Sequence, residues 1–235
     1  MDNDLQGQVV AVTGAFGSLG LAVAQAANER GAQVVMIDRA NAAPANMTPA
    51  LKAAMHLGGV DLTDFNAASR AMAHIEERFG RLDALVNVAG GFRWETLADG
   101  DLASWDFLYN INLRTALTTT KAALPLILHS PAGRVVNIGA SAAQKAGAGM
   151  GAYAAAKSGV ARLTESLAEE LKDTLITVNA VLPSILDTEP NRRDMPDADH
   201  TRWVSPDALA AVIVFLLSAQ ASAVTGALLP VSGRV

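Results

Sequence analysis

Short runs of apolar, β-branched residues alternate along the chain with longer segments in which apolar residues recur at helical spacing. The short runs are apolar on both faces, which is typical of strands in a parallel sheet that helices cover on both sides. The predicted strands are residues 8–13, 33–38, 55–60, 84–88, 134–138, 177–182 and 228–231. The predicted helices are residues 18–30, 64–79, 104–128, 153–171 and 206–217, with a weaker candidate at 45–54.

Strands that alternate with helices predict the α/β class, as a Rossmann-like doubly wound parallel sheet of about seven strands with helices on both faces. No linker, repeat or low-complexity segment interrupts the pattern, so residues 1–235 are expected to form one domain. The least regular segment, 183–205, is rich in Pro, Asp, Asn and Arg. Its composition fits a substrate-binding loop and a merely solvated connection equally well.

Composition and charge narrow the classes of function. The chain is 51% hydrophobic and 17% charged, as expected of a globular protein with a large core. A net charge of −5 argues against nucleic acid or a membrane as a partner. Without cysteine, and with four histidines at no ligand spacing, no metal site is expected. Neither a signal peptide nor an apolar run of roughly 20 residues is seen, so a soluble, cytoplasmic protein is expected.

A glycine-rich turn, residues 13–20, joins the first predicted strand directly to a helix. Gly14, Gly17 and Gly20 permit a tight turn and a close approach of the backbone to a pyrophosphate at the helix N-terminus. The preceding strand, the following helix and a unit of about thirty residues are the context of a dinucleotide site. Phe16, Ser18 and Leu19 would line this site, unless the turn is glycine-rich without binding a ligand.

Asp38 ends the second predicted strand, eighteen residues after Gly20. A carboxylate at this place can accept hydrogen bonds from both hydroxyls of an adenosine ribose and would repel a 2′-phosphate. NAD(H) is therefore favoured over NADP(H), although Arg39, which follows, could bind a phosphate or stack on the adenine. The alternative for Asp38 is an ordinary solvated carboxylate at a strand end.

Tyr153 and Lys157 lie four residues apart at the start of a predicted helix, so their side chains share one face. A phenol ordinarily keeps its proton until about pH 10. A nearby ammonium group favours the phenolate and brings the phenol pKa toward neutral pH. The pair is a candidate acid/base device, although a Tyr and a Lys at this spacing are also common on helices without any such role.

Together with Asn87-Val88-Ala89-Gly90 after the fourth predicted strand, the glycine-rich turn and Tyr153-x-x-x-Lys157 resemble the short single-domain form of the short-chain dehydrogenase/reductase family. The resemblance covers essentially the whole sequence. Further matching motifs are Asp61-Leu62, Asn110-Ile111-Asn112-Leu113, Val178-Asn179-Ala180-Val181-Leu182-Pro183, Thr188 and Val224-Thr225-Gly226.

The resemblance implies an NAD(P)-binding enzyme that transfers a hydride between nicotinamide and a small alcohol or carbonyl substrate. It implies that Tyr153 is the general acid/base, that Lys157 lowers the Tyr pKa and binds the nicotinamide ribose, and that Asn112 supports a helix irregularity and a water. A serine after the fifth strand would bind the substrate oxygen. The implied cofactor contacts are Asp61 and Leu62 at the adenine, Asn87, Ala89, Gly90 and Gly91 along the cofactor, and Pro183, Ser184, Ile185 and Thr188 at the nicotinamide.

Three positions depart from the family pattern. The middle glycine of the turn is Gly17, whereas the family usually has it at the position of Ser18. The usual catalytic serine, thirteen residues before the tyrosine, is Ala140 here. Ser141 follows it, and a one-residue deletion in the next loop would bring Ser141 into the site, so Ser141 is the predicted catalytic serine. Ser184 stands where the family has a glycine.

The substrate is not identified by the sequence. Its candidate walls are residues 91–96, 142–150 and 185–203, in which Arg93, Arg192 and Arg193 could bind a carboxylate or could simply be solvated. The predicted helices 104–128 and 153–171 carry more apolar surface than one sheet face needs, which predicts self-association as a homotetramer or a dimer. Two alternatives remain for the function: a reductase of a cyclic imine or pterin-like substrate, and a non-catalytic dinucleotide-binding sensor.

Overall fold

The computed structural model describes residues 4–45 and 47–235. Residues 1–3, on which the expected absence of a signal peptide partly rests, lie outside the described residues, as does Asn46 in the weak helix candidate 45–54. No helix in the described part of the chain is long and apolar enough to cross a membrane.

Parallel strands form one sheet in the order β3-β2-β1-β4-β5-β6-β7. The strands are β1 (Val9–Thr13), β2 (Gln33–Ile37), β3 (Met55–Leu57), β4 (Ala84–Asn87), β5 (Arg134–Ile138), β6 (Thr177–Pro183) and β7 (Leu228–Val231). The helices are α1 (Ser18–Glu29), α2 (Pro49–Lys52), α3 (Phe65–Phe79), α4 (Leu102–Tyr109), α5 (Thr115–Leu128), α6 (Gly151–Glu170), α7 (Glu189–Asp194) and α8 (Pro206–Leu217). The predicted fold class is confirmed.

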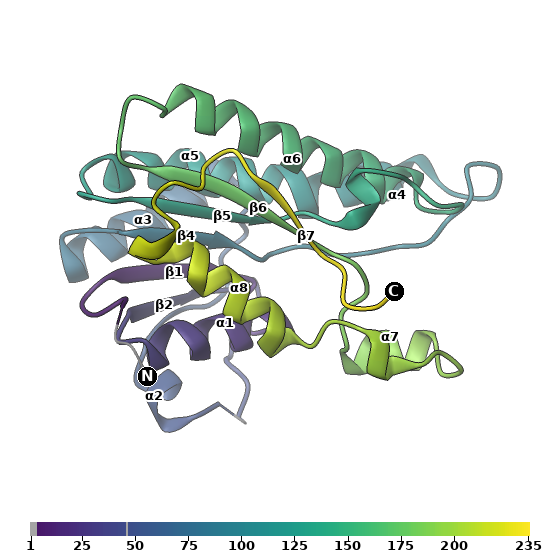
Figure 1. Ribbon diagram of the computed structural model, residues 1–235, viewed down its shortest axis with the longest axis horizontal. Helices are drawn as coiled ribbons and strands as arrows, with labels where there is room; N and C mark the ends of the chain where they lie inside the picture. Colours follow the sequence, from purple (N-terminus) through teal and green to yellow (C-terminus); the bar gives the residue numbers. More distant parts are fainter. Residues whose placement is uncertain (1–3, 46) are drawn as a thin grey trace.

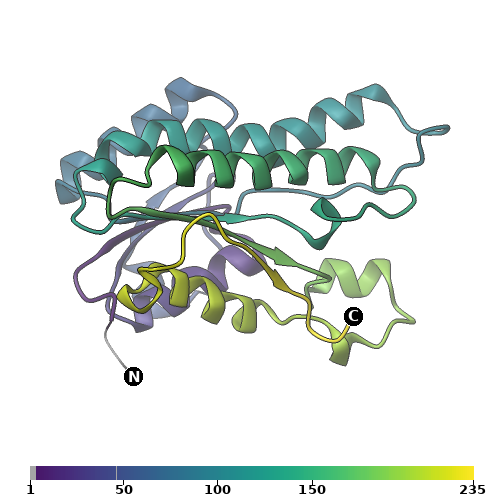
Figure 2. The same cartoon turned by 45° about the horizontal axis from the view of Figure 1, so that its top comes forward.

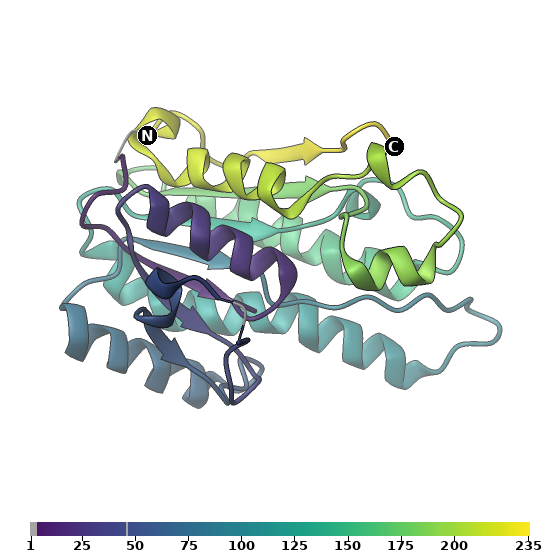
Figure 3. The same cartoon turned by 90° about the horizontal axis from the view of Figure 1, so that it is seen from below.

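The strands are apolar on both faces because helices cover both faces of the sheet (Figure 1). Along β1, Val10 and Val12 belong to the core beneath α1 and α8, and Val9 and Ala11 belong to the core beneath α3, α5 and α6. Figure 3 shows α1 and α8 side by side on one face, and Figure 2 shows α6 running alongside α4 and α5 on the other.

The predicted helix 104–128 is two helices separated by a π-helical turn, Asn110–Arg114. In this turn the side chain of Asn112 donates through Nδ2 to the carbonyl oxygen of Leu108, at 3.0 Å. π-Helical turns commonly mark functional sites, because they redirect side chains out of the regular helical pattern. The apolar pattern does not predict this interruption, because apolar residues recur at helical spacing throughout residues 104–128.

The segment 183–205 is more regular than its composition predicts. Pro183 completes β6, and the segment contains α7 and a 3-10 turn at His200–Arg202. Thr188 caps α7, with Pro190 in its first turn, a combination typical of a helix start. Arg202 holds the segment to the C-terminal end of the chain by donating to the carbonyl oxygen of Arg234, and Figure 1 shows α7 near that end.

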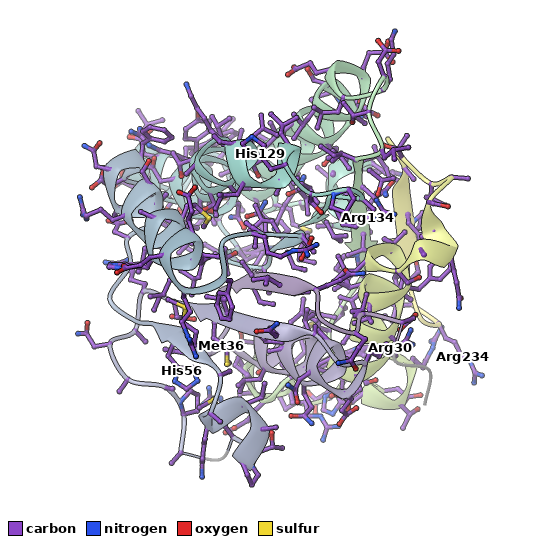
Figure 4. The ribbon with its side chains drawn as sticks, turned by 90° about the vertical axis from the view of Figure 1, so that its left-hand side faces the viewer. Arg30, Met36, His56, His129, Arg134 and Arg234 are labelled. Carbon is purple, nitrogen blue, oxygen red and sulfur yellow. The ribbon has the colours of Figure 1, made fainter. Side chains whose placement is uncertain are left out.

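At the amino-terminal ends of the strands, the buried carboxylate of Asp83, which directly precedes β4, connects several segments by hydrogen bonds. It accepts hydrogen bonds from the backbone N–H of Val9 at 2.9 Å, from Nε and Nη2 of Arg81 at 2.9 and 2.6 Å, and from the hydroxyl of Ser130 at 2.7 Å. Figure 4 looks onto these ends of the strands, where Arg134 begins β5. Asp83 therefore joins the beginnings of β1 and β4 to the loop before β5.

The ionised form of Asp83 is the one that the fold stabilises. Burial by itself would raise the pKa of this carboxyl, but the hydrogen bonds from Arg81, Val9 and Ser130 outweigh burial and hold the pKa below its ordinary value. A depressed folded-state pKa contributes stability above the unfolded pKa, and this stability is lost as the pH falls through the folded pKa.

We predict that Asp83→Asn lowers the free energy of unfolding by about 2 kcal/mol or more at pH 7, because charged hydrogen bonds are lost in a buried place. The difference from the wild type should narrow as the pH falls from about 4, near the ordinary pKa of the carboxyl, through the lower pKa of the folded state. Urea unfolding at several pH values measures both effects. Asp173→Asn, on the exposed turn after α6, is the matched control; an equal loss in both variants would contradict the role of Asp83.

Candidate active site

The candidate site lies at the carboxyl ends of the strands, where the loops after β1 and β4 touch. The hydroxyl of Thr13, at the end of β1, accepts hydrogen bonds from the backbone N–H groups of Val88 and Ala89 at 3.0 and 3.1 Å. Gly14 has φ = +60°, and a Cβ on it would lie 2.8 Å from the Cα and N of Ala89. A side chain at position 14 would therefore push the two loops apart.

The start of α1 packs closely on this turn. A Cβ on Gly20 would lie 2.1 Å from the carbonyl oxygen of Gly14, so only glycine fits. At Gly17 a Cβ would be 3.4 Å from the same oxygen, close to ordinary contact, so the unusual position of the middle glycine does not obstruct the turn. Gly17 caps α1 without a side-chain hydrogen bond, and Ser18 and Leu19 begin the helix with no acidic residue in the first turn. These backbone N–H groups suit a bound anion.

Asp38 follows β2 directly and lies against the same turn. Its Oδ2 accepts a hydrogen bond from the backbone N–H of Phe16 at 2.9 Å, and its Oδ1 accepts one from Ala40 at 2.9 Å. Each carboxylate oxygen retains a second lone pair for a ligand hydroxyl. Phe16 itself packs edge-on against His56, with ring centroids 5.9 Å apart. Asp38 thus lies at the end of β2, where the ribose was predicted to bind, and it also holds the glycine-rich turn through the N–H of Phe16.

A cavity of about 510 Å³ lies beside the exposed side chain of Arg39. The pKa of Asp61, which also lines it, is lowered chiefly by hydrogen bonds from the hydroxyl and backbone N–H of Thr63, with Arg39 and Arg114 adding to the effect. The side chain of Leu62, by contrast, is buried in the core beneath α3. The other residues that line the cavity are Thr63, Asp64, Phe107, Asn110, Ile111 and Arg114.

Lys157 is 5% exposed, and its Nζ donates to the carbonyl oxygen of Ile138 at the end of β5, at 2.7 Å. Burial lowers the pKa of Lys157 to about 8. Its Nζ lies 5.9 Å from the centroid of the Tyr153 ring.

Burial also raises the pKa of Tyr153 to about 12, so in the protein by itself desolvation outweighs the lowering of the Tyr pKa expected from Lys157. The physical reason is that the same desolvation disfavours the charged form of both groups.

Asn112 joins the π-helical turn to the loop after β4. Its Nδ2 donates to the carbonyl oxygen of Gly91 at 2.9 Å, and its Oδ1 accepts from the N–H of Gly91 at 3.2 Å. A Cβ on Gly90 would lie 2.8 Å from Oδ1 of Asn112 and 3.4 Å from Nζ of Lys157. Gly90 therefore lets Asn112 and Lys157 approach the same point, next to Tyr153.

Ser141 and Ala140 are placed differently with respect to Tyr153. Ala140, Ala142 and Ala154 form a small buried cluster, against which Tyr153 and Met150 pack. Ser141 begins the 3-10 turn after β5, and its side chain is exposed. Among the described residues its hydroxyl has no hydrogen-bond partner. The structure therefore brings Ala140, at the usual serine position, toward Tyr153, and does not place Ser141 in that cluster.

Several other predicted site residues have their side chains committed to the protein. The buried Asn87 donates through Nδ2 to Thr120 and to Asn137, at 2.9 and 2.8 Å. The hydroxyl of Ser184 donates to the carbonyl oxygen of Ser232 at 2.7 Å. The hydroxyl of Thr188 caps α7. At Ile185 it is the backbone that is engaged, because its carbonyl oxygen accepts from the N–H of Val204.

Two structural contributors were not identified from the sequence. Thr13 holds the loop after β4, and the signal for it is a polar residue that ends an otherwise apolar strand. The carbonyl oxygen of Ile138 holds Lys157, and since any residue type supplies a carbonyl, no sequence signal could reveal it.

The residues present fit a nicotinamide dinucleotide. Gly14 and Gly20 leave a cradle that a Cβ would fill, the N–H groups that begin α1 are free of side-chain caps, and Asp38 lies at the end of β2. These groups suit a pyrophosphate and a ribose.

Comparison with known proteins agrees with this geometry. The family model for short chain dehydrogenases matches residues 8–199. A 2-(S)-hydroxypropyl-CoM dehydrogenase of Xanthobacter autotrophicus is 33% identical over 99% of this chain and 98% of its own. A 3-oxoacyl-[acyl-carrier-protein] reductase of Vibrio harveyi is 30% identical over 98% of both chains.

Among solved structures, a carveol dehydrogenase of Mycobacterium avium in complex with NAD matches with a TM-score of 0.85, at 29% identity and 98% coverage of both chains. The sheet order, the glycine-rich turn and the extent of these matches agree. The chain therefore belongs to the short-chain dehydrogenase/reductase family and is an oxidoreductase of CH–OH or C=O groups.

Proposed function

We propose that this chain is an NAD(H)-dependent reductase or dehydrogenase of a small carbonyl or alcohol substrate, with Tyr153 as its general acid/base. One observation carries the proposal: Gly90 lets Asn112 and Lys157 meet beside Tyr153, at the carboxyl ends of β4 and β5. The nicotinamide supplies the hydride when it is bound, so the protein has only to orient the substrate and handle one proton.

Tyr153 is suited to donating that proton. Its phenol, whose pKa burial raises to about 12, carries a proton at neutral pH that it can pass to the substrate oxygen during reduction, as a weaker acid than an ordinary phenol. In the oxidative direction the phenol must first lose its proton, which the positive charges of Lys157 and of the oxidised nicotinamide favour. Lys157, buried with a pKa of about 8, is mostly charged at pH 7.

The preference for NAD(H) rests on Asp38. Its carboxylate is fixed by the N–H groups of Phe16 and Ala40, and its remaining lone pairs suit the two ribose hydroxyls. A 2′-phosphate would meet the negative charge of this carboxylate. Arg39, exposed beside the cavity that Asp61 also lines, would favour a phosphate.

A second candidate, a reductase of a cyclic imine or pterin-like substrate, is favoured by the position of Ala140. A ketone oxygen that gains negative charge benefits from a second donor besides Tyr153, whereas an imine nitrogen needs only the proton. Ala140 offers no donor, and Ser141 is exposed. The remaining alternative, a dinucleotide sensor, gives no reason to bury an ammonium group, which costs stability.

For the assembly, we propose a homotetramer or a dimer formed through α4, α5 and α6. Leu102, Trp105, Tyr109 and Leu117 expose between 40 and 78% of their surface on or beside these helices. Apolar side chains gathered in this way are typical of a surface that a second subunit covers.

We predict that Tyr153→Phe abolishes turnover while leaving the affinity for NADH nearly unchanged, because only the proton donor is removed. Turnover is read by NADH absorbance over a panel of alcohols, ketones and imines, and affinity by Trp fluorescence. Retained turnover would remove Tyr153 from its role.

The two candidate substrates are distinguished by Ser141→Ala measured in parallel on the same panel. A loss of about 10²-fold or more indicates that Ser141 binds the developing oxyanion, and an effect below about threefold supports the imine candidate.

For the cofactor, we predict that NADH binds more tightly than NADPH and that Asp38→Asn narrows the difference. Asparagine keeps an acceptor for the N–H of Phe16 but removes the charge that repels a 2′-phosphate. Fluorescence titration of both cofactors measures the ratio of dissociation constants, with the exposed Asp106→Asn as control. Tighter binding of NADPH to the wild type would overturn the assignment of Asp38.

A further inference from the structure

Phe92, in the loop after β4, packs its ring against Tyr153. The two ring centroids are 5.0 Å apart and the ring planes are perpendicular, an edge-to-face arrangement. Nevertheless 52% of Phe92 stays exposed. A large apolar side chain that is half exposed beside a proton donor offers a ready surface to an apolar ligand.

The loop that carries Phe92 is held in place by the loop before α6. The N–H of Glu95 donates to the carbonyl oxygen of Gly149 at 2.9 Å. Gly149 has φ = +72°, and a Cβ on it would lie 2.2 Å from Cε2 of Trp94, so the indole lies directly against this glycine. Phe92 is therefore anchored at a fixed distance from Tyr153, which favours recognition of a rigid ligand.

The alanines and the methionine that pack with Tyr153 add to this apolar surface. Ala140 and Ala142 are buried, and Met150 packs against them together with Tyr153. With Phe92 these residues form what we call the apolar wall (Phe92, Ala140, Ala142 and Met150). The wall offers no hydroxyl or amide side chain to a polar substituent, which leaves Tyr153 as the polar group within it.

Two of the three arginines that could bind a substrate carboxylate, Arg93 and Arg192, are engaged elsewhere. The guanidinium of Arg93 lies 4.1 Å from the ring centroid of Phe107 and donates to the hydroxyl of Ser104 at 3.1 Å. Arg192 donates to both carboxylate oxygens of Asp187, at 2.5 and 2.7 Å. Recruiting either arginine to an anionic substrate would first break these contacts.

We propose that the substrate is an uncharged, flat ring compound that packs against Phe92, with its reacting C=O or C=N group at Tyr153. The inference rests on the proposed function and names its substrate class. In the reduction, the ring carbon accepts a hydride from the dihydronicotinamide, the heteroatom accepts the proton of Tyr153, and the double bond becomes single. The cofactor is oxidised in the same step, and Tyr153 is reprotonated from solvent.

The test uses α-tetralone as a flat ring ketone, 2-octanone as an open-chain neutral ketone and acetoacetate as an anion. Binding to the NADH-saturated protein is measured by saturation-transfer NMR, and kcat/KM by NADH absorbance. We expect α-tetralone to bind at least about tenfold more tightly than either open-chain probe. Phe92→Ala should weaken α-tetralone binding about tenfold or more, Phe92→Trp should retain it, and neither should change NADH affinity.

Phe65→Ala is the matched control, since Phe65 is an exposed phenylalanine at the start of α3, and it should leave α-tetralone binding unchanged. The inference is overturned if α-tetralone does not bind, if its binding ignores Phe92, or if acetoacetate binds best. Acetoacetate binding that is lost in Lys145→Gln would assign an anionic substrate to the exposed Lys145 instead.

Binding does not require turnover, so the inference and the proposed function can fail separately. Tyr153→Phe protein should bind α-tetralone with the same dependence on Phe92. Ring binding without turnover in the wild type would contradict the proposed function alone. Turnover that does not depend on Phe92 would contradict the substrate class alone.

Discussion

The close approach of neighbouring atoms to the backbone at Gly14, Gly20 and Gly90 is the constraint on which the site depends. At each position a Cβ would lie within 2.8 Å of a neighbouring atom, so these loops meet only because no side chain separates them. The approach at Gly14 brings the turn after β1 onto the loop after β4, and the approach at Gly90 lets that loop sit against Asn112 and Lys157. The parallel strands end on the same side of the sheet, and the glycines let the loops that follow them come close enough to form a site.

The site carries a free-energy cost that the rest of the fold offsets. Lys157 is buried with a single identified hydrogen-bond partner, Ile138, and its pKa of about 8 lies below the ordinary value. The unfolded chain therefore binds this proton more strongly, and near pH 7 the folded state loses about 3 kcal/mol on this account. Asp83, at the opposite end of the strands, contributes to the stability of the folded state, because folding stabilises its ionised form. The charge of Asp83 thus stabilises the fold where the strands begin, and the burial of Lys157 destabilises it where they end.

The sequence predicts most of the fold because its strands are apolar on both faces, and β5 and β7 begin and end where the pattern places them. The sequence pattern does not predict the structure where a single residue determines the local geometry. Asn112 interrupts a helix whose apolar pattern is continuous, and α7 is too polar to be read as a helix except from its cap, Thr188. In the candidate site, the Tyr–Lys spacing is visible in sequence, but the pKa of Tyr153 depends on burial, which only the packed structure gives.

Of the departures from the family pattern, the one with the widest consequence for chemistry is that Ala140 occupies the usual position of the catalytic serine, with Ser141 directly after it. Backbone that is extended at Ala140 directs successive side chains to opposite sides, so one of the two positions faces Tyr153 and the other faces solvent. The alanine faces inward, where it joins Ala142, Met150 and Phe92 around the phenol. A proton donor in such surroundings, with its pKa raised by the same apolar contacts, selects substrates by the shape of their apolar part and by one hydrogen bond. Recognition of a charged group by Arg93 or Arg192 would first break the contacts that these two arginines already make.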